Sequence, residues 1–220
     1  MPTKNRATKI SAPDHRRSVA SLGNGGSHFY LDSRGYHKLN DIINYLHYDC
    51  RGKNVLDIGS STGGFTACVL EHGAKQVVAV EKGTNQMAKP LRFDSRIDLR
   101  EKTDIFDVSR ESLPQIDLVV ADVSFISLRP ILAHAKKQLV SQYTEFLVML
   151  KPQFEAQPKD LVRGVVKNEK VRRAILKDFE NWLKNNGFFI KNKRDNLLSG
   201  KTGNLERFYY LTIAKNDPAK

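Results

Sequence analysis

The residues of this sequence that could do chemistry begin with a stretch rich in glycine and serine at positions 59–65. It follows an apolar run at 53–58 that predicts a strand buried on both faces, and a helix is expected to begin near its end. Glycines let the backbone approach a nucleotide-like ligand closely, and a helix amino terminus favours negative charge. The spacing of Gly59, Gly63 and Gly64 departs from the G-x-G-x-x-G pattern, which argues against a nicotinamide cofactor. A plain tight turn between strand and helix is the alternative interpretation.

Three acidic residues fall near the ends of successive expected strands. Parallel sheets open a ligand crevice at the carboxyl ends of their strands. Glu81 is therefore placed to accept hydrogen bonds from ribose hydroxyls, Asp104 to meet an adenine amino group, and Asp57 to orient the glycine-rich loop. Each carboxylate could instead cap the turn that follows it.

A parallel sheet would bring the glycine-rich loop and the three carboxylates together at one edge. Strand-like runs recur at 53–58, 76–81, 97–101, 116–122 and 144–151, with helical patterns at about 64–72, 84–92 and 128–140. This alternation predicts an α/β, Rossmann-like fold with a mostly parallel seven-stranded sheet, right-handed crossovers and helices on both faces.

The chain before and after these runs completes the expected fold. An amphipathic helix that buries Leu39, Ile42, Ile43 and Leu46 precedes the first strand. A helix at 168–186 leads to two final strands, at 188–194 and 205–214, with no helix between them, which predicts an antiparallel hairpin. Such a closing hairpin distinguishes S-adenosylmethionine-dependent methyltransferases from dehydrogenases, and the 53–65 stretch resembles the first motif of those methyltransferases.

Composition indicates one globular domain of ordinary size, since 40% of the 220 residues are hydrophobic and 27% are charged. We expect a disordered basic tail at 1–27, a domain at 28–215 and a short tail at 216–220. No segment has the apolar length of a membrane span or the core of a signal peptide, and the two cysteines fit no metal site. These features predict a cytoplasmic protein with reduced thiols, no bound metal and no membrane partner.

The charge of the chain favours a polyanionic partner. Lys and Arg number 36 against 24 Asp and Glu, which gives a net charge of +12. Neutralisation of phosphates drives sequence-independent binding to nucleic acid, so RNA is the expected partner. A solvated basic surface is the alternative.

Asp122 ends the fourth expected strand, at the position that faces the transferred methyl group in methyltransferases of this fold. Enzymes that methylate amino nitrogens usually carry an Asn/Asp-Pro-Pro-aromatic run here, and cytosine-C5 enzymes need a nearby cysteine; the sequence has neither. What is left is Asp122 together with Lys151, which ends the fifth strand. Lys151 could also simply hold a phosphate.

Five blocks between about Tyr30 and Ala214 carry a family resemblance: Ser33–Leu39, Leu56–Thr66, Ala121–Leu128, Lys151–Glu155 and Gly203–Glu206. They are similar to the hemolysin A (TlyA) family, within the FtsJ-like group of ribosomal RNA 2′-O-methyltransferases. The resemblance implies a catalytic tetrad of Lys38, Asp122, Lys151 and Glu206. It also implies S-adenosylmethionine as cofactor, held by residues drawn from the loop and the strand ends: Asp57, Gly59, Ser60, Ser61, Thr62, Gly63, Gly64, Phe65, Glu81, Lys82, Asp104 and Asp122.

The sequence departs from that family in three places. The family's RNA-binding S4 domain would precede the catalytic domain, and the 1–27 tail is too short for it, so a separate RNA-binding partner is one expected substitute. The entry motif reads Gly-Tyr-His-Lys at 35–38 instead of Gly-Gly-Leu-Lys. Glu81 stands where the family more often has Asp.

The tetrad leads to a mechanistic hypothesis in which Lys151 accepts the proton of a ribose 2′-hydroxyl. Burial and a nearby cation such as Lys38 can lower the pKa of a lysine towards neutrality. Asp122 and Glu206 would orient the lysines and the hydroxyl. Holding the hydroxyl in line with the methyl group would supply much of the acceleration.

RNA phosphates are expected to meet basic residues around the crevice: Arg34, Lys159, Arg163, Lys167 and Lys201. Arg172 and Arg173 are interpreted either as part of this rim or as the polar face of the 168–186 helix. Two other functional classes stay open. One is a non-catalytic protein that binds RNA or the ribosome, and the other is a membrane-active hemolysin, for which we find no amphipathic basic helix.

Overall fold

The computed structural model describes residues 33–196, 198 and 203–214. The expected tails at 1–27 and 216–220 lie outside this part of the chain. Seven strands form one sheet in the order β3-β2-β1-β4-β5-β7-β6. The strands are β1 (Asn54–Ile58), β2 (Gln76–Val80), β3 (Ile97–Arg100), β4 (Leu118–Ala121), β5 (Glu145–Leu150), β6 (Phe188–Asp195) and β7 (Arg207–Ile213). The helices are α1 (Arg34–Leu46), α2 (Gly64–Glu71), α3 (Lys89–Arg92), α4 (Leu128–His134), α5 (Pro152–Glu155) and α6 (Glu169–Asn185).

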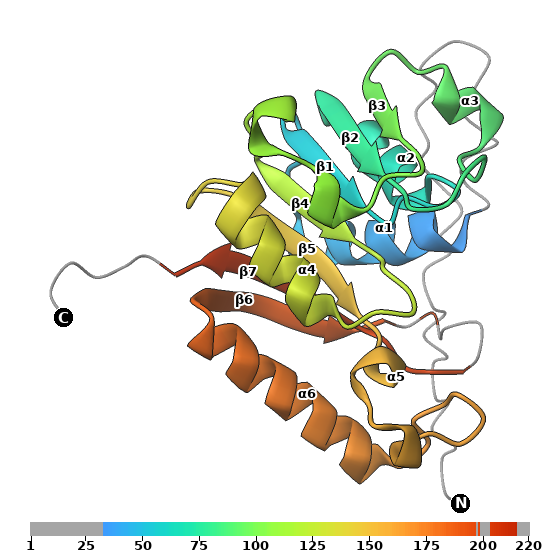
Figure 1. The fold of residues 1–220 in the computed structure, drawn as a ribbon, viewed down its shortest axis with the longest axis vertical. Coiled ribbons are helices and arrows are strands. Elements are labelled where there is room, and N and C mark those ends of the chain that lie inside the picture. Colours follow the sequence, from blue (N-terminus) through green and yellow to red (C-terminus); the bar gives the residue numbers. More distant parts are fainter. Residues whose placement is uncertain (1–32, 197, 199–202, 215–220) are drawn as a thin grey trace, which may run out of the picture.

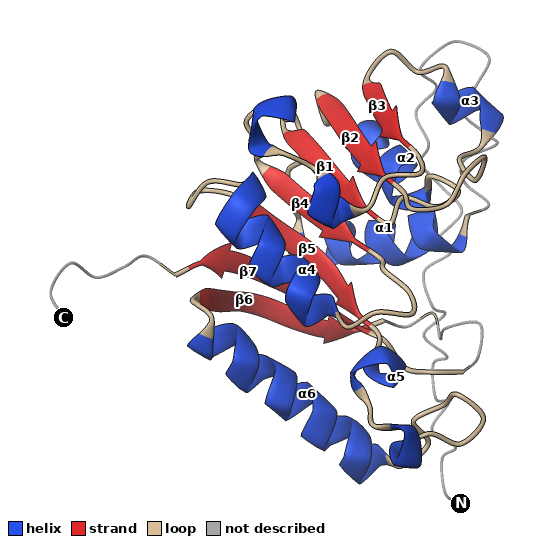
Figure 2. Ribbon diagram, in the orientation of Figure 1, coloured by secondary structure: helices blue, strands red, loops and turns tan. Residues whose placement is uncertain are grey.

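The predicted α/β fold with a mostly parallel sheet is confirmed. Strands β1 to β5 pair in parallel, whereas β7 lies antiparallel between β5 and β6. The predicted closing hairpin therefore forms, with its second strand inserted beside β5. Figure 2 shows the arrowheads of the parallel strands pointing to the same edge of the molecule. That edge is where ligands bind in sheets of this kind.

Helices cover both faces of the sheet, as predicted (Figure 1). Side chains of a strand alternate between its two faces, so β1 contributes to both cores. Leu56 joins one hydrophobic cluster with residues of α4 and α6, such as Leu132 and Phe179, while Val55 joins the other with residues of α1 and α2, such as Leu39. Burial on both faces explains why the central strands are almost entirely apolar.

The helix predicted at 84–92 is wrong in its extent, because only the four residues of α3 are helical. Pro90 sits in the first turn of α3, and a proline ring clashes with the carbonyl four residues before it. A longer helix would place that carbonyl, of Gln86, inside the helix. The helix predicted at 128–140 ends as α-helix at His134 and continues as a π-helical turn, Ala135–Leu139.

Candidate active site

The glycine-rich loop turns sharply between β1 and α2. Gly59 has a φ of +80°, a left-handed conformation that glycine adopts without strain. Its N–H donates to the carbonyl of Val80, and the Gly63 N–H donates to the carbonyl of Ser60. These bonds fold the loop back over the ends of β1 and β2.

Glu81 joins the loop to the residues after β2. Its Oε2 accepts a hydrogen bond of 2.9 Å from the Ser61 N–H, and its Oε1 accepts one of 2.7 Å from the Gly83 N–H. Carboxylates keep further lone pairs when each oxygen accepts one bond. Glu81 can therefore hold the loop in place and still accept bonds from ligand hydroxyls.

Asp57 lies behind the loop rather than in the crevice. It is the penultimate residue of β1 and fully buried, and its Oδ2 accepts a bond of 2.6 Å from the Thr66 hydroxyl in α2. Burial raises the pKa of this carboxyl from 3.8 to about 7. Asp57 lines neither of the cavities described below, and its bond to Thr66 holds the first turn of α2.

The first cavity, of about 620 Å³, opens beside β1, β2 and β4. Its lining is polar at Gly59, Ser61 and Glu81 and apolar at Ile105 and Phe106. Lys82 and Asp104 also line this cavity, and they form an ion pair of 2.9 Å. The hydrogen bond from Lys82 holds the pKa of Asp104 below its ordinary value, with help from the Phe106 N–H.

Sequence reasoning missed the apolar wall of this cavity. Ile105, Phe106, Ile126 and Ile131 read as ordinary core or loop residues, and nothing in their spacing indicates a site. The structure shows that Phe106 is 41% exposed and stacks edge-to-face on His134. The exposure of the Phe106 ring beside the polar strand ends indicates that it belongs to the site.

The second cavity, of about 780 Å³, contains all four residues of the predicted tetrad in its lining. Lys38 Nζ and Glu206 Oε2 lie 2.5 Å apart, and both residues are buried, at 7% and 3% exposure. Lys151 Nζ and Asp122 Oδ1 lie 2.6 Å apart. The hydrogen bond from Lys151 is directed to the Ser124 hydroxyl, at 2.7 Å. Each lysine is thus paired with a carboxylate, and both pairs line the same cavity.

A close approach of two helices positions Lys38. A Cβ atom on Gly64, at the start of α2, would lie 2.4 Å from the Ser33 Oγ and 2.8 Å from the Tyr36 backbone nitrogen. Such distances leave no room for any side chain there. Glycine at this position lets the first turn of α1 pack on α2, which places Lys38 over the ends of the strands.

Glu206 is held by the segment that leads into β7. Arg172 of α6 is buried and donates a hydrogen bond of 3.2 Å to the carbonyl of Leu205 and one of 2.5 Å to Asp195. The Asn196 N–H donates to the carbonyl of Glu206. Arg172 therefore supports the tetrad from inside the protein, whereas Arg173 is exposed on α6 and pairs with Glu169.

The two cavities share a wall. Gly59, Ser61, Asp122, Ser124 and Phe125 line both of them. Phe125 is 92% exposed, has a φ of +66° that is rare for a bulky residue, and contacts Phe154 with ring centroids 5.4 Å apart. A ligand group in one cavity and a ligand group in the other would therefore meet at Asp122.

The remaining predicted residues are spread over the site. Ser60, Thr62, Gly64 and Phe65 line the second cavity, while Gly63 packs against Leu91 and Met87 instead.

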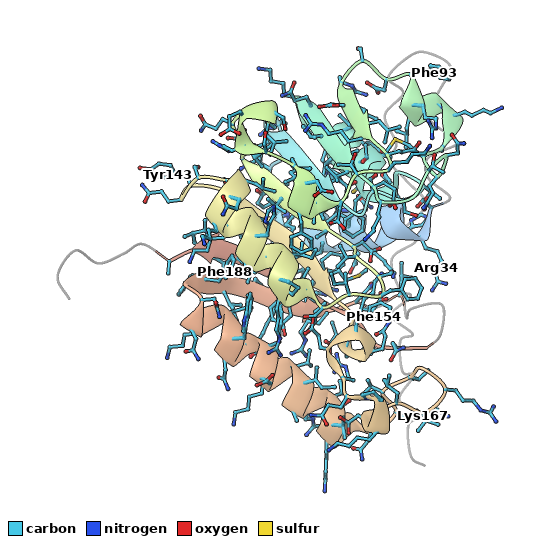
Figure 3. The ribbon with its side chains drawn as sticks, viewed as in Figure 1. Arg34, Phe93, Tyr143, Phe154, Lys167 and Phe188 are labelled. Carbon is cyan, nitrogen blue, oxygen red and sulfur yellow. The ribbon has the colours of Figure 1, made fainter. Side chains whose placement is uncertain are left out.

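Among the predicted substrate-binding residues, Arg34 lines the second cavity. Lys159, Arg163 and Lys167 are exposed between α5 and α6 and line neither cavity, although Gly164 lines the second. Figure 3 shows Arg34, Phe154 and Lys167 along one edge of the molecule. Lys201 lies outside the described residues.

Comparison with known proteins shows the family to which this chain belongs. The model of the FtsJ-like methyltransferases matches residues 31–212. The chain belongs to the FtsJ-like methyltransferase family.

Similarity to individual proteins supports the same family. The chain is 36% identical over 181 residues to a Campylobacter jejuni protein named 23S rRNA (cytidine-2′-O)-methyltransferase TlyA, covering 81% of this chain and 69% of the relative. It is 34% identical to the protein named hemolysin A of Brachyspira hyodysenteriae, covering 82% and 76%. A solved structure of a Streptococcus thermophilus protein, proposed to be a hemolysin, superposes with a TM-score of 0.80 at 31% identity, covering 87% and 70%.

An FtsJ-like methyltransferase uses S-adenosylmethionine, the cofactor that the sequence predicted, and the first cavity fits it. Glu81 offers carboxylate oxygens for ribose hydroxyls, and the apolar wall offers a slot for a flat base. In the same loop, on the side of the second cavity, the Ser60 hydroxyl is buried without a hydrogen-bond partner in the described structure and can bond to a polar ligand group. The described residues contain no group of three or more His, Cys, Asp or Glu side chains that could share a metal ion.

Proposed function

We propose that this protein transfers the methyl group of S-adenosylmethionine to a ribose 2′-hydroxyl of ribosomal RNA in the cytoplasm. The observation that carries the proposal is the shared wall at Asp122, where the cofactor cavity meets the cavity lined by the four tetrad residues. The name of the Campylobacter jejuni relative, a cytidine-2′-O-methyltransferase of 23S rRNA, supports the same reaction. Recruitment of a separate RNA-binding partner stays a prediction.

Lys151 is the residue that accepts the proton of the reacting hydroxyl. Its Nζ already lies 2.7 Å from an alcohol oxygen, that of Ser124, which is within the distance needed for proton transfer. A ribose hydroxyl that takes the place of the Ser124 hydroxyl would stand beside Asp122 and at the mouth of the cofactor cavity. The bound cofactor supplies a methyl group carried on a sulfonium.

The other three tetrad residues orient Lys151 and the substrate. The Asp122 Oδ1 lies 2.6 Å from the Lys151 Nζ and holds the amine in position; the lysine accepts the proton in its neutral form. Lys38 and Glu206 are buried, line the same cavity and can hydrogen-bond the sugar. Fixing the hydroxyl in a near-attack position lowers the barrier by removing translational and rotational freedom in advance.

The rim of the cavity suits a single-stranded nucleotide. Phe125 presents an almost fully exposed ring, and Phe154 lies against it. Exposed aromatic rings next to basic residues stack on unpaired bases. A nucleotide with its base on this aromatic pair would direct its ribose towards Lys151.

The test is a Lys151→Ala variant assayed with radiolabelled S-adenosylmethionine and deproteinised ribosomal RNA. We expect methyl transfer to be lost and cofactor affinity, measured by calorimetry, to stay within about twofold of the wild-type value, because Lys151 does not line the cofactor cavity. Lys177→Ala, which removes an exposed charge from α6, is the matched control. Retained turnover by Lys151→Ala would remove Lys151 from the mechanism. A wild-type protein that binds RNA but not the cofactor would support the non-catalytic alternative.

The nucleotide and the ribosomal subunit can be found by mapping 2′-O-methyl groups in RNA from cells with and without this protein. We expect at least one site to lose its methyl group. As to the membrane-active alternative, none of the helices among the described residues has the length and apolarity to cross a bilayer.

A further inference from the structure

The chain between α5 and α6 makes a tight turn at the edge of the second cavity. Val162 and Val165 exchange two backbone hydrogen bonds, of 2.9 and 3.1 Å. The two residues between them both have positive φ, +51° for Arg163 and +77° for Gly164. This is the pattern of a two-residue type I′ turn, in which Asn-Gly is the favoured pair. The backbone conformation of the first position, with φ of +51°, disfavours arginine.

A buried amide fixes this turn to the tetrad. Asn204 is 1% exposed, and its Oδ1 accepts a hydrogen bond of 3.0 Å from the Val166 N–H. Its Nδ2 donates a bond of 3.0 Å to the carbonyl of Gly164. Asn204 stands two residues before Glu206, a span of at most about 7 Å of chain. Gly164 and Glu206 line the same cavity, so the turn and the catalytic carboxylate share one anchor.

Arg163 differs from the other arginines in its lack of partners. Across the described ranges 33–196, 198 and 203–214, it is the one arginine whose guanidinium has no ion pair, hydrogen bond or ring contact. Lys159 and Lys167, on the same segment, are exposed and equally unpaired within those ranges. A guanidinium presents a rigid fork of donors that matches a phosphate group.

We propose that Arg163 binds a backbone phosphate of the RNA strand whose ribose enters the second cavity, and that Asn204 is the positioning residue that fixes this phosphate site relative to Glu206. The proposal rests on the proposed function and adds the contact that sets the register of the strand. Because the turn is rigid and anchored beside the tetrad, a phosphate held at its tip places the neighbouring sugar at a fixed distance from Lys151.

The test compares Arg163→Asn with Arg51→Asn. Asparagine is favoured in a type I′ turn, so Arg163→Asn removes the charge while the turn is kept, and its melting temperature should equal or exceed that of the wild type. Arg51 has a side chain that is 81% exposed and lies just before β1, at the opposite end of the parallel strands, and its replacement changes the net charge equally.

Binding is measured by fluorescence anisotropy with a labelled single-stranded decanucleotide of cytidines. We expect Arg163→Asn to bind about fivefold more weakly at 0.1 M salt, and the slope of log K against log salt to flatten by about 0.7, the value of one phosphate contact on a single strand. Arg51→Asn should match the wild type. Equal affinity and slope for the two variants would overturn the proposal.

Asn204→Ala tests the anchor. It should weaken RNA binding about as much as Arg163→Asn, and the double variant should bind no more weakly than Asn204→Ala alone, because both changes remove the same contact. Additive losses would contradict the anchoring role. These binding measurements need no turnover, so failure of the wild type to methylate RNA would overturn the proposed function separately.

Discussion

Substitutions in the buried Lys38–Glu206 ion pair should affect the stability of the fold and the methyl-transfer activity differently. The side chains are 8% and 4% exposed, and the charged atoms lie 2.5 Å apart. Removing one partner of a buried ion pair leaves an uncompensated charge and typically costs about 3–5 kcal/mol. For a domain of this size 1 kcal/mol corresponds to about 2–4 °C, so Lys38→Met should lower the melting temperature by roughly 10 °C.

Replacing both partners should have the opposite effect on stability. Substituting a buried ion pair by apolar residues of similar volume is often neutral or stabilising. We expect the double variant Lys38→Met, Glu206→Leu to have a free energy of unfolding in urea within about 1 kcal/mol of the wild-type value, because no charge is left unpaired. Methyl transfer should be lost in the single and the double variants alike, since each of them lacks at least one of the two groups proposed to hold the sugar.

The exposed Arg51–Asp49 pair is the control, and Arg51→Met should leave the melting temperature unchanged. The reasoning would be refuted if Lys38→Met cost less than about 1 kcal/mol, or if the double variant were as unstable as the worse single variant. Either result would mean that water entering the cavity already solvates the charges.

Three further predictions concern the loop and its supports. Burial raises the pKa of Asp57 from 3.8 to about 7, so between these pH values the folded state binds a proton that the unfolded chain releases. The free energy of unfolding should therefore fall by up to about 4 kcal/mol as pH rises from about 4 to 7. Urea unfolding of Asp57→Asn should show a flatter pH profile. Gly64→Ala should cost about 1–3 kcal/mol and most of the activity, because the new methyl group would lie 2.8 Å from the Tyr36 nitrogen and push α1 outward; a fully active variant in the transfer assay would contradict this. Glu81→Ala removes the acceptor of the Ser61 N–H and should weaken cofactor binding in calorimetry by about tenfold or more, whereas an unchanged dissociation constant would show that Glu81 does not contact the cofactor.

Local pattern was enough to predict most of the fold. Runs of apolar, β-branched residues separated by amphipathic stretches placed every strand to within a residue or two, because burial on both faces requires apolar side chains throughout a central strand. The main error, the helix at 84–92, arose where the apolar spacing looked helical but Pro90 restricts the chain before it.

The sequence by itself also placed Glu81, Asp104, Asp122 and Lys151 at the site, since parallel strands deliver their carboxyl ends to one edge whatever the loops do. Lys38 and Glu206 were candidates only because of the family resemblance. Only the tertiary structure decided their pairing. Lys38 and Glu206 are 168 residues apart, and no local signal indicates that they form a buried pair separate from Asp122 and Lys151. The support that Asn204 gives to the turn at Arg163 likewise depends on segments that are 38 and 40 residues apart in the chain. Such contacts are set by how helices and loops pack on the sheet, and this packing depends on long-range burial that sequence periodicity does not encode.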